Sequence, residues 1–266
     1  MELRVATLNI WNRMGDWDAR LVAIREHLQK LAPDVIGLQE VLRIDVGGGE
    51  VFDQAALLAD GLGYHVAYGR HPRGQMGNAI LSRFPIVRTH VDPIPDGGTD
   101  ERRSLVLAEL DAPCGRIPFF CTHLNWKLDE GHVRESQVRF VTDRVAHAAP
   151  PDGTTFPPIV VGDFNAEPEA DEIRFMRGLT SLGGKRVYFA DCFGLEGAGP
   201  GTTFSRANPH AAPLREPNRR IDYVFVRGPD ERGRGEPLAA EVCFDAPVGG
   251  AFPSDHFGVI ARIAAP

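Results

Sequence analysis

The sequence predicts an α/β fold in which helices cover both sides of the strand layers. Short apolar runs rich in valine and isoleucine alternate with stretches whose apolar residues recur at helical spacing, and this alternation is typical of α/β proteins. The chain has 266 residues, of which 43% are hydrophobic, so it can bury a sizeable core. We expect residues 1–266 to form one large domain, with two domains as the alternative.

Most of the strands are expected in the first half of the chain. Apolar runs with β-branched residues predict strands, and apolar residues three or four positions apart predict helices. In chain order these patterns give a strand at Leu3–Leu8, a helix at Asp18–Leu31 that Pro33 ends, a strand at Val35–Gln39, a glycine turn at Gly47–Gly49, a helix at Phe52–Leu62, and strands at Tyr64–Ala67, Ala79–Ser82, Ile86–Val91, Ser104–Leu110 and Ile117–Thr122.

The second half alternates helices, strands and loops. The patterns give a helix at Arg134–His147, a loop at Pro150–Gly153, a strand at Ile159–Val161, a helix at Glu169–Leu179, a long irregular loop at Gly194–Pro217, and strands at Ile221–Val226, Ala239–Phe244 and Val259–Ile263. A loop of this length in a compact domain is often functional. We therefore expect the loop at Gly194–Pro217 to select the substrate.

The net charge and the N-terminus bear on partners and location. The formal net charge is −7, which disfavours a protein that grips a long nucleic acid tract, because such proteins usually carry a basic face. No apolar run is long enough for a transmembrane helix. The first residues lack the basic and apolar segments of a signal peptide. We expect a cytoplasmic protein, or a secreted one if a signal peptide has been removed. The sequence predicts no oligomeric state.

Polar and ionisable residues recur at the ends of the apolar strands. In α/β sheets, side chains from the ends of separate strands converge on a ligand site. The residues placed in this way are Asn9, Glu40, His123, Asp163, Asn165, Asp222, Asp255 and His256.

Six short motifs in chain order contain these residues. They are Thr7-Leu8-Asn9-Ile10, Gly37-Leu38-Gln39-Glu40, Thr122-His123-Leu124, Gly162-Asp163-Phe164-Asn165, Arg220-Ile221-Asp222-Tyr223 and Ser254-Asp255-His256, with Ala79–Pro85 as a further match. On these motifs the chain resembles the endonuclease/exonuclease/phosphatase superfamily from its first strand to its last. The resemblance implies one catalytic domain built as a four-layer α/β sandwich, with two packed mixed β-sheets flanked by helices. It also implies hydrolysis of phosphate esters with magnesium or manganese.

The candidate metal ligands are Glu40, Asn9 and Asp255. Carboxylate oxygens, and carboxamide oxygens that point inward, suit hard cations such as Mg²⁺ and Mn²⁺. Glu40 is the first choice as a direct ligand, with Asn9 beside it and Asp255 as a further ligand of one or two ions. A solvated strand end is the alternative for Glu40, and a turn cap is the alternative for Asn9.

The candidate acid–base residues are His256, Asp222 and Asp163. Asp222 and His256 resemble the carboxylate–imidazole pair of the superfamily, in which the carboxylate fixes the tautomer of the ring and raises its basicity. His256 is then either the general base for the attacking water or a donor to a phosphoryl oxygen. Asp163 is the rival general base.

Five further residues are candidates for contacts with the phosphate or the rest of the substrate. Asn165 is expected to donate to developing negative charge, and His123 to a phosphoryl oxygen. The guanidinium of Arg103 matches phosphate geometry, with a solvated charge as the alternative. Asn125 and Trp126 are expected to line the pocket, with a core position as the alternative for Trp126.

The predicted reaction is an in-line attack of water on the phosphorus of a phosphodiester or phosphomonoester, without a covalent enzyme intermediate. The substrate is a small molecule or a nucleic acid. A DNA or RNA nuclease would use a basic patch formed by Arg70, Arg73, Arg102, Arg103, Arg215, Arg219 and Arg220. A sphingomyelinase-like lipid headgroup phosphodiesterase is disfavoured, because no membrane-inserting apolar hairpin is predicted. A non-catalytic binding module is the remaining alternative, and the complete set of carboxylates and histidines disfavours it.

Overall fold

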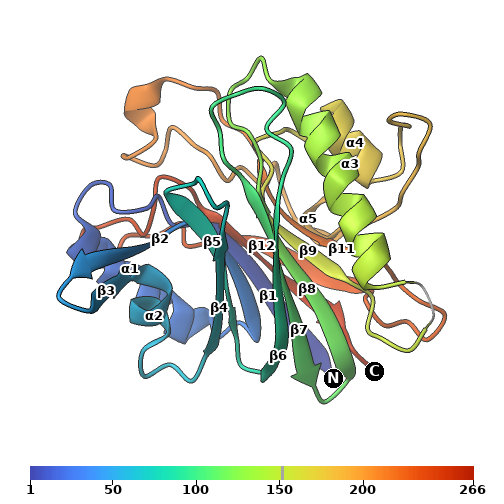
Figure 1. The fold of residues 1–266 in the computed structure, drawn as a ribbon, viewed down its shortest axis with the longest axis horizontal. Coiled ribbons are helices and arrows are strands. Elements are labelled where there is room, and N and C mark those ends of the chain that lie inside the picture. Colours follow the sequence, from blue (N-terminus) through green and yellow to red (C-terminus); the bar gives the residue numbers. More distant parts are fainter. Residues whose placement is uncertain (151–152) are drawn as a thin grey trace.

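Two β-sheets lie face to face in the computed structural model, which describes residues 1–150 and 153–266 (Figure 1). The first sheet contains β1 (Glu2–Asn9), β2 (Val35–Gly47), β3 (Glu50–Asp53), β4 (His65–Arg70), β5 (Met76–Ser82), β12 (Pro237–Cys243) and β13 (Gly258–Ala264). The second contains β6 (Ile86–Pro93), β7 (Ser104–Ala112), β8 (Gly115–His123), β9 (Ile159–Asp163), β10 (Ala190–Asp191) and β11 (Asp222–Val226).

Both sheets are mixed, as the resemblance implies. The strand order is β12-β13-β1-β2-β5-β4 in the first sheet, with β3 paired to β2, and β10-β11-β9-β8-β7-β6 in the second. The pairs β1–β2 and β8–β9 are parallel. The strands β13 and β11, which flank these pairs, run antiparallel to them. In the first sheet, the C-terminal end of β1 therefore lies beside the N-terminal end of β13. In the second, the C-terminal ends of β8 and β9 lie beside the N-terminal end of β11.

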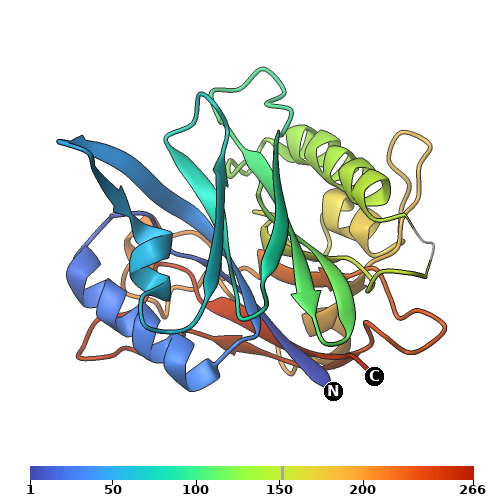
Figure 2. The ribbon, with the colours of Figure 1, turned by 60° about the horizontal axis from the view of Figure 1, so that its bottom comes forward.

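Helices cover the outer face of each sheet and complete a four-layer α/β sandwich (Figure 2). The helices α1 (Trp17–Leu31) and α2 (Gln54–Ala59) pack on the first sheet, and α3 (Gly131–Ala148) and α4 (Asp171–Met176) pack on the second. Two short elements, α5 (Cys192–Glu196) and the 3-10 helix η1 (Ala212–Leu214), lie in the long connection that precedes β11.

The main core lies between the two sheets. Val5 and Ile80 of the first sheet and Phe119 of the second belong to one buried cluster and are fully buried. Gly37 in β2 lets the sheets approach closely, because a β-carbon there would lie 2.3 Å from a methyl group of Val161. Any larger residue at position 37 would push the sheets apart beside the strand ends that carry the polar residues.

The β2–β3 hairpin differs from the sequence prediction. The strand predicted at Val35–Gln39 continues to Gly47 and turns back as β3, which occupies the start of the predicted helix Phe52–Leu62. The reason is that β2 pairs with β3 beyond the point where its apolar run ends. The hairpin exposes Ile44, Val46 and Val51, which alternate along the strands with charged residues such as Asp45 and Glu50.

The other predicted elements occur with shifted ends. The predicted helix Glu169–Leu179 is shorter, and the start of the predicted loop Gly194–Pro217 is helical in α5. Pro151 and Asp152 of the predicted loop Pro150–Gly153 lie outside the described residues. Within the described part of the chain, no helix is long and apolar enough to cross a membrane.

Candidate active site

Adjacent strands of the second sheet place three site residues in one row. His123 ends β8, Asp163 ends β9 and Asp222 begins β11. His123 is in register with Asp163 in the parallel pair, and Asp163 is in register with Asp222 in the antiparallel pair. Gly162 permits this close pairing, because a β-carbon there would lie 2.1 Å from the carbonyl oxygen of Thr122. The glycine before Asp163 is therefore a requirement of the strand pairing.

The first sheet contributes Asn9 and Glu40. Asn9 ends β1 and is in register with Gln39 of β2. The register between β2 and β5 shifts between Leu38 and Val41, and Glu40 has a positive φ of 57°. A bulge of this kind re-aims a side chain, and backbone strain at a non-glycine residue is found disproportionately at functional sites. The bulge places the carboxylate of Glu40 beside Asn9.

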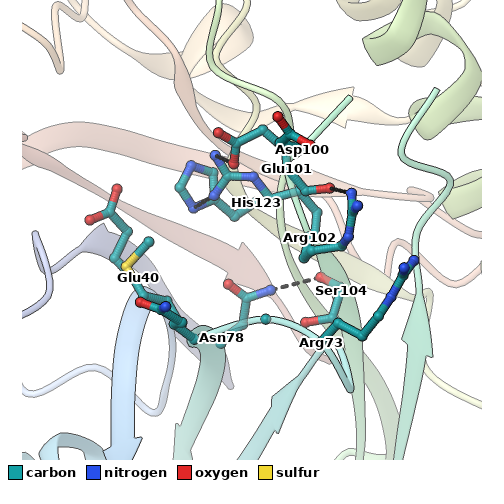
Figure 3. Close-up of a pocket in the computed structure, with 13 residues that line it drawn as sticks. Glu40, Arg73, Asn78, Asp100, Glu101, Arg102, Ser104 and His123 are labelled. Carbon is teal, nitrogen blue, oxygen red and sulfur yellow. Dashed lines mark hydrogen bonds and ion pairs between the residues drawn. The ribbon is translucent and has the colours of Figure 1, made fainter. Parts of the chain in front are cut away.

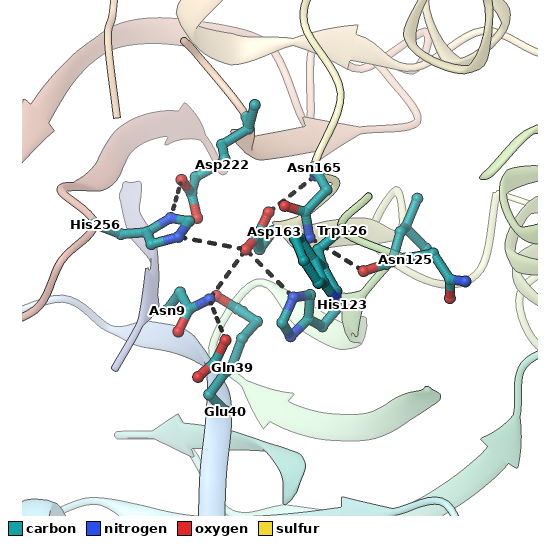
Figure 4. A network of polar contacts seen from close by, with 12 residues as sticks. Asn9, Gln39, Glu40, His123, Asn125, Trp126, Asp163, Asn165, Asp222 and His256 are labelled. Carbon is teal, nitrogen blue, oxygen red and sulfur yellow. Dashed lines mark hydrogen bonds and ion pairs between the residues drawn. The ribbon is translucent and has the colours of Figure 1, made fainter. Parts of the chain in front are cut away.

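The carboxylate of Asp163 lies at the centre of the site (Figure 4). Its Oδ2 accepts a hydrogen bond of 3.0 Å from Asn9 Nδ2, and its Oδ1 accepts one of 2.9 Å from the backbone N–H of Asn165. The Nε2 atoms of His123 and His256 lie 3.4 and 3.8 Å from Oδ2. Polar groups from both sheets therefore converge on one buried carboxylate.

The predicted pair of Asp222 and His256 is present. His256 Nδ1 lies 3.0 Å from Asp222 Oδ2, and the other oxygen of this fully buried carboxylate has no hydrogen-bond partner among the described residues. Thr203 Oγ1 accepts hydrogen bonds from the backbone N–H groups of Ile221 and Asp222. The ring of Phe204 packs edge-on against His256, with the centroids 5.0 Å apart. The long loop thus supports the pair through Thr203 and Phe204.

Arg103 contacts a histidine of the site. Its guanidinium is buried, with 8% of the residue exposed. Nη1 lies 2.9 Å from His123 Nδ1, and Nη2 lies 3.0 Å from Glu101 Oε2. Nε is buried without a partner in the described chain. Protein groups thus engage both ends of the fork, and Arg103 also lines a pocket that Glu40 and His123 share, so its contact with a phosphate stays a prediction.

The orientation of Asn9 also differs from the prediction. Its oxygen Oδ1 accepts a hydrogen bond of 2.9 Å from the backbone N–H of Trp11, while Nδ2 donates to Glu40 Oε1 at 3.3 Å and to Asp163. The carboxamide therefore bridges two carboxylates instead of turning its oxygen inward toward a cation. Asn12 Nδ2 donates to Glu40 Oε2 at 2.8 Å, which the sequence reasoning missed.

The carboxylates of Glu40 and Asp255 have the donor chemistry that a divalent cation needs. Burial and the charge of Glu40 raise the pKa of Asp255 to about 6, although His256 opposes this change. A hard cation bound between these oxygens would offset their repulsion. Asp163, Asp222 and His256 form a second group whose potential ligand atoms lie within 4.8 Å of one another. The contact between His256 and Asp222 already uses Nδ1 of the imidazole in that group.

Burial and neighbouring charges drive the pKa values of the site apart. Burial and the Asp222 carboxylate raise the pKa of Asp163 from 3.8 to about 7. Burial alone would lower the pKa of His256, but the Asp222 and Asp163 carboxylates raise it well above 6.5. Burial and the Arg103 guanidinium lower the pKa of His123 well below 6.5. The two carboxylates therefore favour the cationic form of His256, whereas burial and Arg103 favour the neutral form of His123.

Asn125 and Trp126 were both expected to line the pocket, and the structure places them differently from each other. Asn125 is fully buried, and its carboxamide bonds to Thr99, Glu130 and Gln137. These contacts fix the loop after β8 against α3, so Asn125 is structural. Trp126 is 49% exposed and is not a core residue. Its Nε1 donates a hydrogen bond of 2.8 Å to Glu101 Oε1.

A pocket of about 290 Å³ opens beside the site (Figure 3). Glu40 and His123 line one part of it, and the other lining residues include Arg73, Asn78, Glu101, Arg102 and Arg103. Carboxylates also line it, so positive charge does not dominate.

The arginines of the predicted basic patch do not form one surface. Arg219 and Arg220 are buried, and Arg220 binds both oxygens of Asp191 at 2.9 and 2.8 Å. Arg73 and Arg102 share Asp96 as an ion-pair partner. The burial of Arg219 and Arg220 keeps the seven arginines from forming one exposed patch, whereas Arg73, Arg102 and Arg103 line the pocket beside the site.

The fold and the site define a class of four-layer α/β sandwich proteins with a buried carboxylate–imidazole centre at one edge of the sheets. The model of the endonuclease/exonuclease/phosphatase family matches residues 6–256, and the chain belongs to this family. The uncharacterised protein YbhP of Escherichia coli strain K12 is 30% identical to it over 242 residues, which cover 84% of each chain.

Solved structures show the same fold. Truncated TDP2 of Caenorhabditis elegans matches with a TM-score of 0.77 and 19% identity, over 100% of this chain and 98% of that chain. TDP2 of D. rerio, complexed with a single-strand DNA product, matches with a TM-score of 0.76 and 17% identity, over 99% of each chain.

Proposed function

We propose that this protein hydrolyses phosphate ester bonds with a divalent metal ion, Mg²⁺ or Mn²⁺, through in-line attack of water. The observation that carries the proposal is the convergence of Asn9, His123, Asn165 and His256 on Asp163, with Glu40 joined to the same network through Asn9. Such an arrangement needs residues from both sheets and has no evident structural purpose. It fits the family to which the chain belongs.

Glu40 and Asp255 are the residues that would hold the ion. A bound Mg²⁺ or Mn²⁺ supplies charge that polarises a phosphoryl oxygen and stabilises the leaving oxygen. Asn9 and Asn12 hold the Glu40 carboxylate in place through their side-chain N–H groups. Asn9 is then a positioning residue for the two carboxylates that it bridges.

Asp163 is the general base of the proposed reaction. Its pKa of about 7 suits a base that must accept a proton from water near neutral pH. Hydrogen bonds from Asn9 and Asn165 fix the orientation of the carboxylate. The cationic His256, held by Asp222, is better suited to donate to a phosphoryl oxygen than to accept a proton from water.

His123 and Asn165 stabilise negative charge that develops on the phosphoryl oxygens. The neutral His123 presents Nε2 toward Asp163, where the attacking water would lie. Asn165 Nδ2 donates to the carbonyl oxygen of Leu124 at 3.1 Å, and its second N–H remains available for a substrate oxygen. Donors fixed before the reaction lower the energy of the transition state without reorganisation.

The test is hydrolysis of a generic aryl phosphodiester by purified protein with Mn²⁺ or Mg²⁺, with and without EDTA. We expect metal-dependent turnover that EDTA abolishes and that His256→Asn lowers by about 10²–10⁴-fold. His147→Asn, at an exposed position of α3, is the matched control and should keep wild-type turnover. Turnover that is insensitive to EDTA, or equal in the His256 variant, would contradict the proposal.

A substrate panel then separates the remaining classes. It compares plasmid DNA, short RNA, sphingomyelin, inositol phosphates and simple phosphomonoesters under the same metal conditions. The burial of Arg219 and Arg220 favours a small phosphate ester over a nucleic acid. The single-strand DNA product bound by D. rerio TDP2 keeps nucleic acid in the panel.

A further inference from the structure

We propose that Arg103 is a positioning residue that holds His123 as a neutral imidazole with its proton on Nε2. The catalytic meaning of this inference rests on the proposed function. Arg103 Nη1 lies 2.9 Å from His123 Nδ1. A guanidinium carries only N–H donors, so Nδ1 must present its lone pair to accept this hydrogen bond. The remaining ring proton of a neutral imidazole then lies on Nε2.

Glu101 and Trp126 fix the guanidinium from the other side. Arg103 Nη2 lies 3.0 Å from Glu101 Oε2, and Glu101 Oε1 accepts the hydrogen bond of Trp126 Nε1 at 2.8 Å. Arg103 and His123 are 8% and 4% exposed, so water has little access to their contact. The chain of contacts therefore runs from the surface at Trp126 to the imidazole in the site.

The two histidines beside Asp163 have Nδ1 partners of opposite charge. His123 Nδ1 faces a cationic donor, whereas His256 Nδ1 faces the Asp222 carboxylate. A partner on one ring nitrogen decides the tautomer and basicity of the other. His123 is therefore a hydrogen-bond donor at Nε2 and cannot accept the proton of water there. His123 is thereby excluded as the general base, in agreement with the proposed reaction, which assigns that role to Asp163.

Nitrogen NMR of protein labelled with ring-nitrogen-15 histidine tests the tautomer directly and needs no substrate. In metal-free wild type at neutral pH, we expect the His123 signals of a protonated Nε2 and an unprotonated Nδ1. The signals are assigned by their loss in His123→Gln. In Arg103→Met this pattern should give way to a mixture of tautomers or to the imidazolium. An Nδ1-protonated His123 in the wild type, or an unchanged pattern in Arg103→Met, would overturn the inference.

Kinetics on the aryl phosphodiester give the second readout. We expect Arg103→Met to lower kcat by about 10–100-fold, the range seen when a supporting hydrogen-bond partner is lost, with little change in KM. Arg103→Lys should recover part of kcat, because one N–H donor can still reach Nδ1. Arg116→Met, at the opposite end of β8, is the matched control and should behave as wild type. Equal loss in Arg103→Met and Arg103→Lys would count against positioning.

The two proposals fail in distinguishable ways. If wild-type protein hydrolyses no ester in the panel, the proposed function fails, while NMR still decides the tautomer. If the protein is active and His123 carries its proton on Nδ1, the proposed function stands and the role of Arg103 falls. Should Arg103→Met not fold, the wild-type spectrum and Arg103→Lys still decide the question.

Discussion

Asn9 and Asp163 are 154 residues apart in the chain, yet Nδ2 of Asn9 donates a buried hydrogen bond of 3.0 Å to Oδ2 of Asp163. Asn9 ends a strand of the first sheet, and Asp163 ends a strand of the second. The contact therefore joins the two sheets at the edge where Glu40, His123 and His256 also meet. A site of this kind exists only if the sheets pack in the observed register.

Replacing the central carboxylate should abolish activity. Asp163→Asn keeps the shape of the side chain but cannot accept a proton from water, so we expect kcat to fall by about 10²–10⁴-fold. Turnover of the aryl phosphodiester at saturating Mn²⁺ measures this. Asp111→Asn, at an exposed position of β7, is the control. Near-normal kcat in Asp163→Asn would exclude Asp163 as the base.

The stability of the metal-free protein should fall as pH rises through the neutral range. The raised pKa of Asp163 means that the folded state disfavours its charged form, so this penalty is absent below pH 3.8 and grows up to about pH 7. The raised pKa of His256 contributes stability that is complete below pH 6.5 and is lost as pH rises through the folded-state pKa. Both effects therefore have the same sign, whereas the lowered pKa of His123 raises stability as pH rises toward 6.5.

Urea unfolding in EDTA between pH 4 and pH 8 measures this dependence. Each group contributes a slope of at most about 1.4 kcal/mol per pH unit within its own window. Asp163→Asn removes the contribution of the Asp163 carboxylate to this slope. The free energy of unfolding of the variant should therefore rise relative to that of wild type as pH rises from about 4 to 7. A difference between variant and wild type that is constant with pH would contradict the assigned pKa.

Divalent metal should stabilise the protein through Glu40. A ligand that binds only the folded state stabilises it by about 2.7 kcal/mol at a concentration of 100 times its Kd. We expect Mn²⁺ to raise the Tm of wild type and of Glu26→Gln, an exposed control on α1, and to have little effect on Glu40→Gln. An equal Tm shift in all three proteins would place the metal elsewhere.

Removing the hydroxyl of Thr203 should weaken the pair of Asp222 and His256. In Thr203→Val, the buried N–H groups of Ile221 and Asp222 lose their acceptor, which costs about 1–3 kcal/mol for an unsatisfied buried group. The free energy of unfolding measured with urea should fall, and kcat should fall as well. The isosteric change Thr89→Val, at an exposed position of β6, should alter neither. Wild-type kcat in folded Thr203→Val would show that the loop does not support the pair.

The sequence predicted the residues of the site better than it predicted their contacts. His123, Asp163 and Asp222 stand at the ends of clear apolar strands, so their convergence follows once the strands pair in register. Glu40 was placed at the end of a strand, but it lies inside β2, because the bulge there depends on pairing with β5. The local sequence pattern around Glu40 does not indicate that β2 pairs with β5.

The contacts of Arg103 and Asn125 share one physical cause. Arg103 matches phosphate by its chemistry, but its burial and its partner His123 are set by the packing of β7 against β8. Asn125 follows a site motif, yet its side chain turns toward Gln137 of α3. Each outcome depends on tertiary neighbours that lie 12 or more residues away, which the spacing of polar residues does not report.

Anomalous scattering from a crystal grown or soaked with Mn²⁺ would locate the metal that the proposed reaction requires. We expect a manganese peak bounded by the carboxylates of Glu40 and Asp255. Absence of that peak at a manganese concentration that supports turnover, or manganese bound only elsewhere on the protein, would contradict this expectation.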